Sequence, residues 1–464
     1  MTAVVIIGGG PGGYEAALVG RQLGADITLI DSNGLGGSAV LTDCVPSKTL
    51  IATANAMHTA AESGGLGVMI DGQPAASHLL NVNLDVVNTR VKALATAQSE
   101  DIHERLLREG VQIVHGHGRL SGSTLVLATT PAGDEMTYRA DAVLIATGAR
   151  PRQLADAMPD GDRIVNWEQL YDLKVLPARL IVVGSGVTGA EFASAYHGLG
   201  SQVVLISSRD RVLPGEDPDA AAVLEEVYAR RGLEVISQAR ALSARRTEDG
   251  VVVKLADGRQ IFGSHVLMAV GSIPNTEHLG LKDAGVDLDK NGFIKVDRVS
   301  RTSTQGVYAA GDCTGVFKLA SVAAMQGRIA MWHALGDAVN PLDLHLVSSN
   351  VFTSPEIATV GLTQQDLDEE TFRGDVIMLP FATNARAKMQ DQHDGFVKIF
   401  CRRGSRLIAG AVVVGINASE LIHVLTVALA QRMTVDELAS AFTVYPSLSG
   451  SIAEAARRLH VHSE

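Results

Sequence analysis

The chain has 464 residues, of which 46% are hydrophobic and 19% are charged, and its formal net charge is −12. This composition indicates a globular protein of two to four domains, and the acidic charge argues against nucleic acid or an anionic membrane surface as a partner. With only three cysteines the chain is not expected to be a secreted disulfide scaffold, and the reducing cytoplasm is favoured. No uncharged apolar run approaches the ~18 residues of a membrane span, which argues against an integral membrane protein.

The first apolar run, Val4–Ile7, is followed by the spaced glycines Gly8, Gly10 and Gly13. A run this short, stopped by glycines, predicts a buried parallel strand and not a signal peptide. A strand that leads through G-x-G-x-x-G into a helix is typical of a dinucleotide site. The first glycine makes the tight turn, the second lets the backbone approach a pyrophosphate, and the third lets the helix pack closely. Asp31, at the end of the next predicted strand, can accept hydrogen bonds from a ribose diol.

A second informative segment, residues 36–48, reads Gly-Gly-Ser-Ala-Val-Leu-Thr-Asp-Cys-Val-Pro-Ser-Lys. Pro46 suits the first turn of a helix, so a helix is predicted to begin with Ser47. Cys44 would then lie at a helix N-terminus, where the pKa of a thiol is lowered. A role for Cys44 as a small buried apolar residue stays equally open.

The middle of the chain adds further elements to the first nucleotide site. Residues 81–109 are expected to be mostly helical and residues 111–138 to be rich in strands. The apolar run 143–145 reads as a buried strand, and Thr147 and Gly148 follow it in a turn.

The opening pattern recurs 176 residues later, where Gly184, Gly186 and Gly189 follow the apolar run 181–183 without a gap in the register. A single G-x-G-x-x-G is weak evidence, but two aligned copies in the same strand–helix context make a chance glycine turn improbable. The sequence therefore predicts a second dinucleotide unit.

The two units differ at the end of their second strands. Ser207 stands where the first unit has Asp31, and Ser208 and Arg209 follow it. No carboxylate is there to repel a 2′-phosphate, and hydroxyls and a guanidinium can bind one, so NADPH is favoured over NADH. The alternative is that Arg209 and Arg211 belong to an ordinary solvated loop.

Later segments return to the first site and then change character. Gly271 lies in a turn after an apolar run, and a predicted strand at 307–310 ends at Gly311 and Asp312. From residue 346 onward the pattern changes to strands at 396–400 and 409–414, and helices follow from Ala418.

These motifs resemble those of the flavoprotein disulfide reductases, or pyridine nucleotide-disulfide oxidoreductases, the family of lipoamide dehydrogenase and glutathione reductase. The resemblance covers almost the whole chain. It implies an α/β fold with two Rossmann-like dinucleotide-binding domains and a C-terminal α+β dimerisation domain, bound FAD, NADPH or NADH as reductant, and a homodimer. The implied domains are 1–148 and 272–345 for FAD, 149–271 for NAD(P)H, and 346–464 for the dimer interface.

The resemblance also implies the site residues. Lys48 matches a lysine beside flavin N5 that pairs with the glutamate matching Glu191, and a cation there stabilises the reduced flavin. The catalytic candidates are Lys48, Glu191, Cys44 and Tyr445. The candidates for cofactor binding are Gly8, Gly10, Gly13, Asp31, Lys48, Thr147, Gly148, Gly184, Gly186, Gly189, Ser207, Ser208, Arg209, Gly271, Gly311 and Asp312.

Two departures separate this chain from that family. The family's segment has two cysteines five positions apart, which form the disulfide that takes electrons from FAD, but Ala39 stands at the first position and only Cys44 remains. The family also has a C-terminal His and, five residues on, a Glu, which do acid–base work at the other subunit's site. Tyr445 and Gly450 stand there, and a phenol with a pKa near ~10 cannot exchange protons at neutral pH as imidazole does. Tyr445 is expected either to line that site or to act in it directly.

These losses, within the resemblance, imply an FAD-dependent NAD(P)H:quinone reductase of the diaphorase type. It would pass hydride from NAD(P)H to FAD and then electrons to a small-molecule quinone. Three alternatives stay open: a single-cysteine NAD(P)H oxidase or peroxidase in which Cys44 cycles through sulfenic acid, a nicotinamide transhydrogenase, and a non-catalytic flavin redox sensor. No metal site is predicted, because the histidines are scattered without further ligands at suitable spacing.

Overall fold

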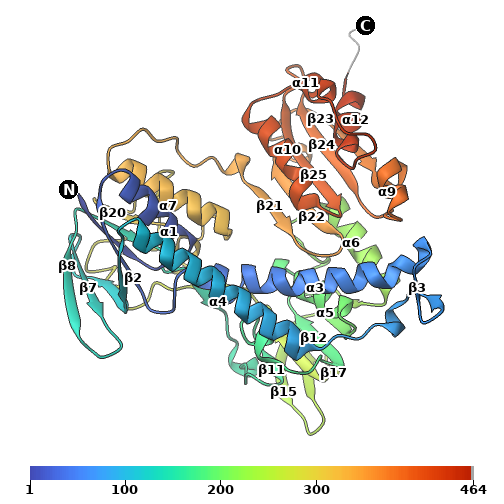
Figure 1. Cartoon of the computed structure of the whole chain (residues 1–464), viewed down its shortest axis with the longest axis horizontal. Coiled ribbons are helices and arrows are strands. Elements are labelled where there is room, and N and C mark those ends of the chain that lie inside the picture. The colour runs from blue at the N-terminus through green and yellow to red at the C-terminus, as the bar shows by residue number, and fades with distance from the viewer. Residues whose placement is uncertain (461–464) are drawn as a thin grey trace. The chain divides into compact units, whose positions relative to one another are not determined.

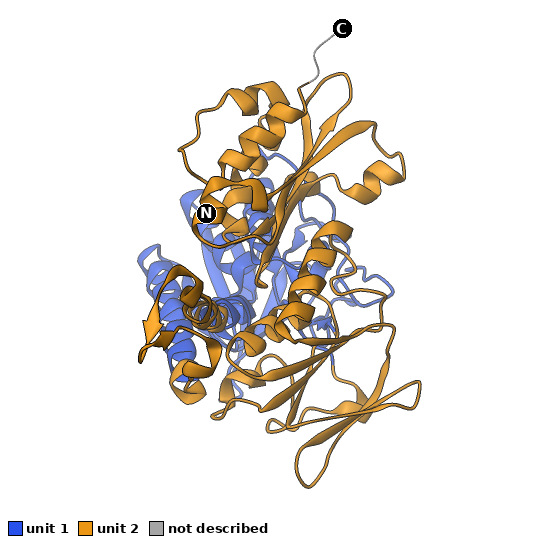
Figure 2. Ribbon diagram, turned by 90° about the vertical axis from the view of Figure 1, so that its right-hand side faces the viewer, with its two compact units in different colours: residues 1–49, 88–152, 271–343 blue, residues 50–87, 153–270, 344–464 orange. Residues whose placement is uncertain are grey.

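The computed structural model describes residues 1–460, and the chain divides into two compact units (Figure 2). Unit 1 contains residues 1–49, 88–152 and 271–343, and unit 2 contains residues 50–87, 153–270 and the chain from 344 onward. The changes between units near 152, 270 and 343 lie close to the domain boundaries expected at 148, 271 and 345. Residues 50–87, which were expected in the FAD domain, group with unit 2.

Unit 1 is built on a parallel sheet in the order β20-β9-β1-β2-β5. Its strands are β1 (Ala3–Ile7), β2 (Asp26–Asp31), β5 (Gln112–His115), β9 (Ala142–Ile145) and β20 (Val307–Ala309). The predicted strands are confirmed. Their continuous apolar runs reflect burial on both faces, because parallel sheets are covered on both sides. Ile6 and Leu144 pack in the core on one face, and Val5 and Val143 pack in the core on the other.

Helices cover one face of this sheet and small antiparallel sheets accompany it. The helices are α1 (Pro11–Gln22), α2 (Gly37–Leu41), α4 (Leu84–Arg108) and α7 (Ala320–Ala334). The additional strands are β6 (His117–Leu120), β7 (Leu125–Thr129), β8 (Glu135–Arg139), β10 (Ala149–Pro151) and β19 (Ser272–Pro274). Helices α1 and α7 lie side by side (Figure 1), and a Cβ on Gly327 would collide with the carbonyl oxygen of Gly12. The expected helical stretch and the strand-rich stretch after it are confirmed.

Unit 2 repeats the parallel design in the order β11-β18-β12-β13-β14. The strands are β11 (Ile164–Val165), β12 (Arg179–Val183), β13 (Gln202–Ile206), β14 (Glu234–Ile236) and β18 (His265–Met268). They are accompanied by α5 (Val187–Gly198), α6 (Pro218–Arg231), β15 (Ala241–Arg246), β16 (Val251–Leu255) and β17 (Gln260–Gly263). The internal repeat read from the glycine pattern therefore corresponds to two separate sheets.

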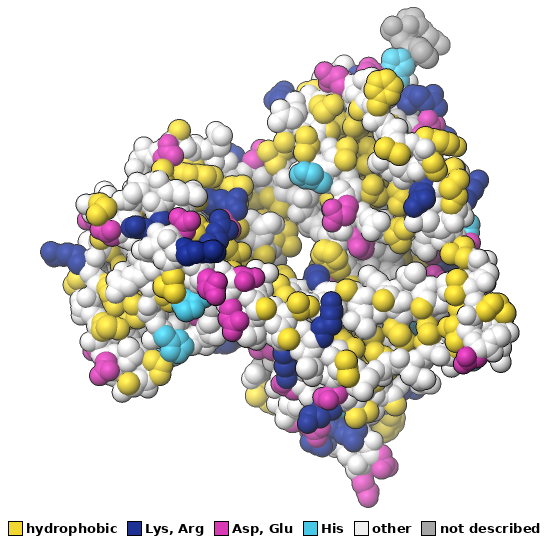
Figure 3. All heavy atoms as spheres, in the orientation of Figure 1, with side chains coloured by type: hydrophobic (Ala, Val, Ile, Leu, Met, Phe, Trp, Pro, Cys, Tyr) yellow, Lys and Arg dark blue, Asp and Glu magenta, His cyan; other side chains and the backbone are white. Residues whose placement is uncertain are grey.

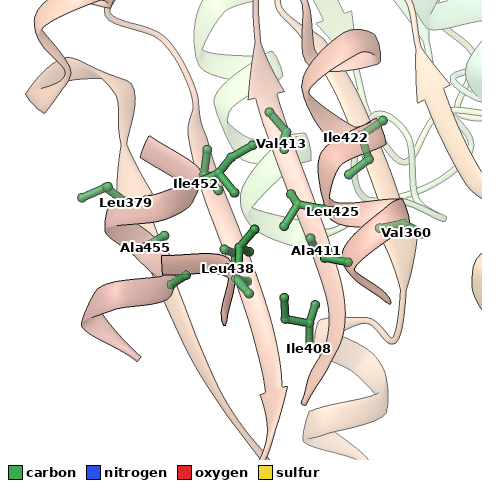
Figure 4. Close-up of a cluster of buried hydrophobic side chains, with 14 of the residues drawn as sticks. Val360, Leu379, Ile408, Ala411, Val413, Ile422, Leu425, Leu438, Ile452 and Ala455 are labelled. Carbon is green, nitrogen blue, oxygen red and sulfur yellow. The ribbon is translucent and has the colours of Figure 1, made fainter. Parts of the chain in front are cut away.

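The C-terminal part of unit 2 is an antiparallel sheet with helices, in the order β21-β22-β25-β24-β23. Its elements are β21 (Ser348–Val351), β22 (Glu356–Gly361), α8 (Gln364–Asp368), β23 (Gly374–Pro380), α9 (Ala385–Met389), β24 (Phe396–Arg402), β25 (Ile408–Gly415), α10 (Ala418–Ala430), α11 (Val435–Ser440) and α12 (Gly450–Arg458). Figure 4 shows Val413, Leu425 and Ile452 among the buried side chains between sheet and helices. The expected α+β domain is confirmed.

Helix α3 (Cys44–Glu62) begins earlier than predicted. The sequence placed its start at Ser47, but Cys44 is the first helical residue and Pro46 lies inside the first turn. Proline is tolerated there because the first four N–H groups of a helix have no intrahelical acceptor. The short strands β3 (Met69–Ile70) and β4 (Gln73–Pro74) follow.

The distribution of charge and the hydropathy of the helices bear on the expectations from the composition. Acidic and basic side chains are interspersed over the face shown in Figure 3, so the net negative charge is not collected in one patch on that face. Among residues 1–460, no helix is long and apolar enough to cross a membrane.

Candidate functional site

The glycines after β1 shape a turn that other residues could not adopt. Gly8 has a φ of +107°, and a Cβ there would collide with the carbonyl oxygen of Ala146 on the neighbouring strand segment. A Cβ on Gly13 would in turn collide with the carbonyl oxygen of Gly8. Gly10 is the N-cap of α1, so the helix N-terminus opens directly onto this turn. Such a terminus offers amide donors and a positive dipole to a phosphate.

Asp31, the last residue of β2, organises the loops at this edge of the sheet. Its Oδ2 accepts a hydrogen bond from Gly9 N at 2.7 Å, and its Oδ1 accepts from Asn33 N at 2.8 Å and from Gly34 N at 2.7 Å. The carboxylate is therefore fixed in position by backbone donors before any ribose hydroxyl reaches it.

Thr147 and Gly148 follow β9 at the same edge of the sheet. The segment after β19 fixes their position through hydrogen bonds of Asn275. Thr147 Oγ1 donates to the carbonyl oxygen of Asn275 at 2.6 Å, and Asn275 Nδ2 donates to the carbonyl oxygen of Thr147 at 3.0 Å. Gly148 and Gly271 both have positive φ, +68° and +90°, at the turns between these segments. Sequence reasoning missed Asn275 as a support, since its role appears only through a contact 128 residues away.

Asp312 follows β20 and is half-buried. Burial raises the pKa of its carboxyl, and the nearby Lys318 ammonium acts in the opposite direction. Lys318 also donates from Nζ to Ser272 Oγ at 2.9 Å. Gly311 has a φ of +81° and its N–H donates to Gln326 Oε1 at 2.8 Å, which fixes the turn before the carboxyl. The sequence offered no signal for Lys318, which was not among the candidates.

These features fit a flavin dinucleotide. The turns at Gly8, Thr147 and Gly311 all follow strands of one parallel sheet, and ligands bind at the carboxyl ends of such strands. The glycine turn and the N-terminus of α1 suit a pyrophosphate, and Asp31 suits a ribose diol. Asp312 is a half-buried acceptor whose ionised form gains from hydroxyl donors such as those of a ribityl chain.

The predicted reactive residues of unit 1 lie together at the start of α3. Cys44 and Lys48 are one helical turn apart, so their side chains lie on the same face of the helix, and both are half-buried. Ala39 is on the short helix α2 before them. Within residues 1–460, Cys44, Cys313 and Cys401 form no disulfide. Burial raises the pKa of Cys313 to about 11, so this thiol does not ionise at neutral pH.

The second glycine turn, in unit 2, repeats the first in detail. Gly184 has a φ of +112°, and a Cβ there would collide with the carbonyl oxygen of Ala269. A Cβ on Gly189 would collide with the carbonyl oxygen of Gly184. Gly186 caps α5, and a Cβ there would meet nothing within 4 Å. The open space beside Gly186 suits the close approach of a second pyrophosphate.

The loop after β13 shows which of the predicted side chains face outward. Ser207 is fully buried, and its Oγ lies 2.7 Å from Ser185 Oγ and accepts from Arg209 N at 3.1 Å. Arg211 is turned toward its own loop and donates from Nη2 to the carbonyl oxygen of Pro214 at 3.3 Å. The side chains of Ser208 and Arg209 are exposed. Ser207 therefore shapes the loop from within, while Ser208 and Arg209 face outward, and their binding of a 2′-phosphate stays a prediction.

Glu191 is held rigidly in unit 2. It lies on α5, is 3% exposed, and its Oε1 accepts from the backbone N–H of Phe352 at 2.8 Å. A buried carboxylate needs such donors, because desolvation of an unpaired charge is costly. The expected pairing of Lys48 with Glu191 stays a prediction.

Tyr445 lies in an exposed apolar segment between α11 and α12. Its side chain is 86% exposed, and those of Phe442 and Val444 are also exposed. Large apolar side chains exposed together mark an interaction surface more often than a solvated one. The predicted role of Tyr445 at the site of a partner subunit stays a prediction.

Two substitutions in the second glycine turn should separate binding from folding. We expect Gly186→Ala to leave the thermal midpoint of unfolding unchanged, because its Cβ has space, and to weaken NADPH binding by roughly tenfold or more by blocking the pyrophosphate. Gly189→Ala should instead lower the thermal midpoint, because its Cβ collides with backbone. Calorimetric titration with NADPH and thermal unfolding would measure both. Equal loss of stability in the two variants would contradict this assignment.

Comparison with known proteins places this geometry in a family. The family model described as pyridine nucleotide-disulphide oxidoreductase matches residues 2–327, and the dimerisation domain of that family matches residues 347–456. The chain therefore belongs to the pyridine nucleotide-disulphide oxidoreductase family. It is an oxidoreductase with the family's cofactors, FAD and a pyridine nucleotide, so the predicted family, enzyme class and cofactors are confirmed.

Individual members of the family are similar to this chain over nearly its whole length. An "NAD(P)H dehydrogenase (quinone)" of Mycobacterium tuberculosis strain H37Rv is 53% identical over 100% of this chain and 95% of its own length. A dihydrolipoyl dehydrogenase of Zymomonas mobilis is 32% identical, over 97% of this chain and 96% of its own length. The crystal structure of LpdA from Mycobacterium tuberculosis matches with a TM-score of 0.94 and 52% identity, covering 99% of this chain and 100% of that one. The Escherichia coli flavoprotein RclA, at 22% identity and a TM-score of 0.86, shares the fold.

Proposed function

We propose that this chain is an NAD(P)H:quinone reductase in which bound FAD accepts hydride from NAD(P)H and transfers electrons to a quinone. The observation that carries the proposal is the single sulfur at the start of α3: Ala39 on α2 precedes Cys44, and no disulfide forms within the described residues. The 53% identical relative named for quinone reduction supports the same acceptor.

Neither of the other two cysteines is suited to thiol–disulfide exchange. Cys313 is fully buried, and its Sγ donates to the carbonyl oxygen of Ala310 at 3.3 Å. Burial raises the pKa of its thiol to about 11. A thiol must ionise before it can attack in disulfide chemistry. Cys401 is buried in the core of the C-terminal sheet, and burial raises the pKa of its thiol as well. These properties favour electron transfer to an acceptor without a thiol relay.

Residues of this chain would then act by position and charge. Lys48 would hold a positive charge beside the flavin, and Glu191 would orient that site with its backbone-bonded carboxylate. Tyr445 would line the quinone site of a partner subunit in a homodimer, for which the matched dimerisation domain gives support. The three cysteines without disulfides favour a cytoplasmic location.

Reductive titration tests the missing disulfide. We expect each subunit to take up two electrons from dithionite under anaerobic conditions, because a flavin without a neighbouring disulfide stores one pair. Turnover with lipoamide or glutathione disulfide should be negligible. Uptake of four electrons would mean that Cys44 has a redox partner and would overturn the proposal.

The acceptor is tested separately. Steady-state turnover of NADPH with a benzoquinone should proceed equally well with and without oxygen. Rapid oxygen consumption without quinone reduction would support a single-cysteine oxidase instead. The absence of turnover with either acceptor in flavin-loaded protein would support a redox sensor.

A further inference from the structure

A buried lysine of the C-terminal sheet is bonded to the start of helix α6. Lys398 lies in the middle of β24 and is 2% exposed. Its Nζ donates to Asp217 Oδ2 at 2.9 Å and to Asp219 Oδ2 at 2.7 Å. Asp217 is buried as well, whereas Asp219 is half-exposed. Burying an ammonium is costly unless carboxylates neutralise it and accept its hydrogens, so this position in the sheet demands both partners.

Asp217 uses its two carboxylate oxygens for two different tasks. Its Oδ1 caps α6 by accepting from Asp219 N at 2.9 Å and from Ala220 N at 3.3 Å. Its Oδ2 binds Lys398. The lysine therefore orients the carboxylate that begins the helix, and any loss of Lys398 acts on the residues just before α6.

The residues just before α6 form the loop that the sequence predicts to discriminate between NADPH and NADH. Loop 207–217 runs from the end of β13 to the cap of α6. At its first end Ser207 Oγ lies 2.7 Å from Ser185 Oγ, and in its middle Leu213 N donates to the carbonyl oxygen of Ser185 at 2.8 Å. Val212 N donates to Glu225 Oε1 on α6 at 2.7 Å, and at the other end of the loop Asp217 binds Lys398. Between these anchors the side chains of Ser208 and Arg209 are exposed.

We propose that Lys398 is a positioning residue for recognition of the cofactor's 2′-phosphate. By fixing Asp217 it sets loop 207–217 so that Ser208 and Arg209 meet that phosphate. Lys398 is itself enclosed by two carboxylates, so its influence on the cofactor passes through Asp217. The inference rests on the proposed NAD(P)H reductase function and on the preference for NADPH that the sequence predicts, and it extends the predicted specificity site to a residue of the C-terminal domain.

The test is the ratio of kcat/KM for NADPH to that for NADH in the flavin-loaded enzyme, with ferricyanide as acceptor so that the quinone assignment does not enter. Lys398→Met should lower this ratio roughly fivefold to tenfold, because Asp217 loses the hydrogen bond that orients it and one hydrogen bond is typically worth this much. Asp219→Asn should lower it less, because Lys398 still binds Asp217. Lys254→Met, which removes an exposed lysine of the same unit, should leave the ratio unchanged.

Binding of fragments gives a readout independent of turnover. Adenosine 2′,5′-bisphosphate should lose affinity for the Lys398→Met enzyme, and AMP, which lacks the 2′-phosphate, should not. If the methionine variant does not fold, Asp217→Asn serves in its place, because its amide oxygen can still cap α6 while the charge that binds Lys398 is gone. A variant that lowers both affinities, or both kcat/KM values, to the same extent would overturn the inference.

A double variant completes the test. Once Arg209→Ala has removed the guanidinium, adding Lys398→Met should lower the ratio much less than it does in the unmutated enzyme, since both act largely on one interaction. Additive effects would overturn the inference. If Arg209→Ala lowers the ratio but Lys398→Met does not, the inference fails and the NADPH assignment stands. If Arg209→Ala has no effect on the ratio, both the NADPH assignment and the inference about Lys398 fail.

Discussion

Replacing Lys48 with alanine should slow reduction of the enzyme-bound flavin by NADPH by ~10²–10³, because the loss of one preorganised charge beside a reacting group typically has this size. The electrostatic reason is direct. Negative charge develops at the flavin when hydride arrives, and the Lys48 ammonium, half-buried one turn into α3, is screened less than a surface lysine would be. Anaerobic stopped-flow absorbance would measure the rate.

Two further substitutions on the same helix separate charge from sulfur chemistry. Cys44→Ser should change quinone turnover much less than Lys48→Ala, although the two side chains lie on one face of α3. Lys48→Arg keeps the positive charge and should restore part of the rate. If Cys44→Ser abolishes quinone turnover while flavin reduction stays fast, electrons pass through the thiol and the proposed route is wrong.

Much of the fold followed from the sequence because its signals are local. Apolar runs that end in spaced glycines predicted the two parallel sheets, and the structure shows why the glycines were informative. Gly13 and Gly189 each face the carbonyl oxygen of the first glycine of their own turn, where a Cβ has no room. A constraint of this kind acts within six residues, so a sequence pattern can record it.

The supports of the site could not be read in the same way. Asn275 fixes Thr147 by a hydrogen bond, and the charge of Lys318 lowers the pKa of Asp312 against the effect of burial. Asp217 is bonded to a lysine 181 residues away. None of these partners has a characteristic spacing. Each depends on which segments the sheets bring together, and that information is distributed over the whole chain.

Ser207 shows a subtler limit of reasoning from residue type. Its hydroxyl made it a plausible phosphate ligand, and it does stand at the position of Asp31 in the repeat. In the structure it is fully buried and bonded to Ser185. Residue type indicated hydrogen bonding correctly, but only the backbone path of the loop decides whether the hydroxyl points outward. The exposed Arg209 is therefore the sharper test of cofactor choice.

Arg209→Ala should reduce the preference for NADPH over NADH by ten- to about a hundredfold, because a charge-assisted contact of this kind contributes ~1.5–3 kcal/mol. The loss should appear in kcat/KM for NADPH and leave the value for NADH nearly unchanged, since NADH has no 2′-phosphate to bind. Arg245→Ala, which removes another exposed guanidinium in unit 2, is the matched control and should alter neither value. Salt should weaken NADPH binding to the unmutated enzyme more than to the variant, because screening acts on the exposed guanidinium–phosphate pair. Equal or better kcat/KM with NADH in the unmutated enzyme would show that loop 207–217 does not select for the 2′-phosphate.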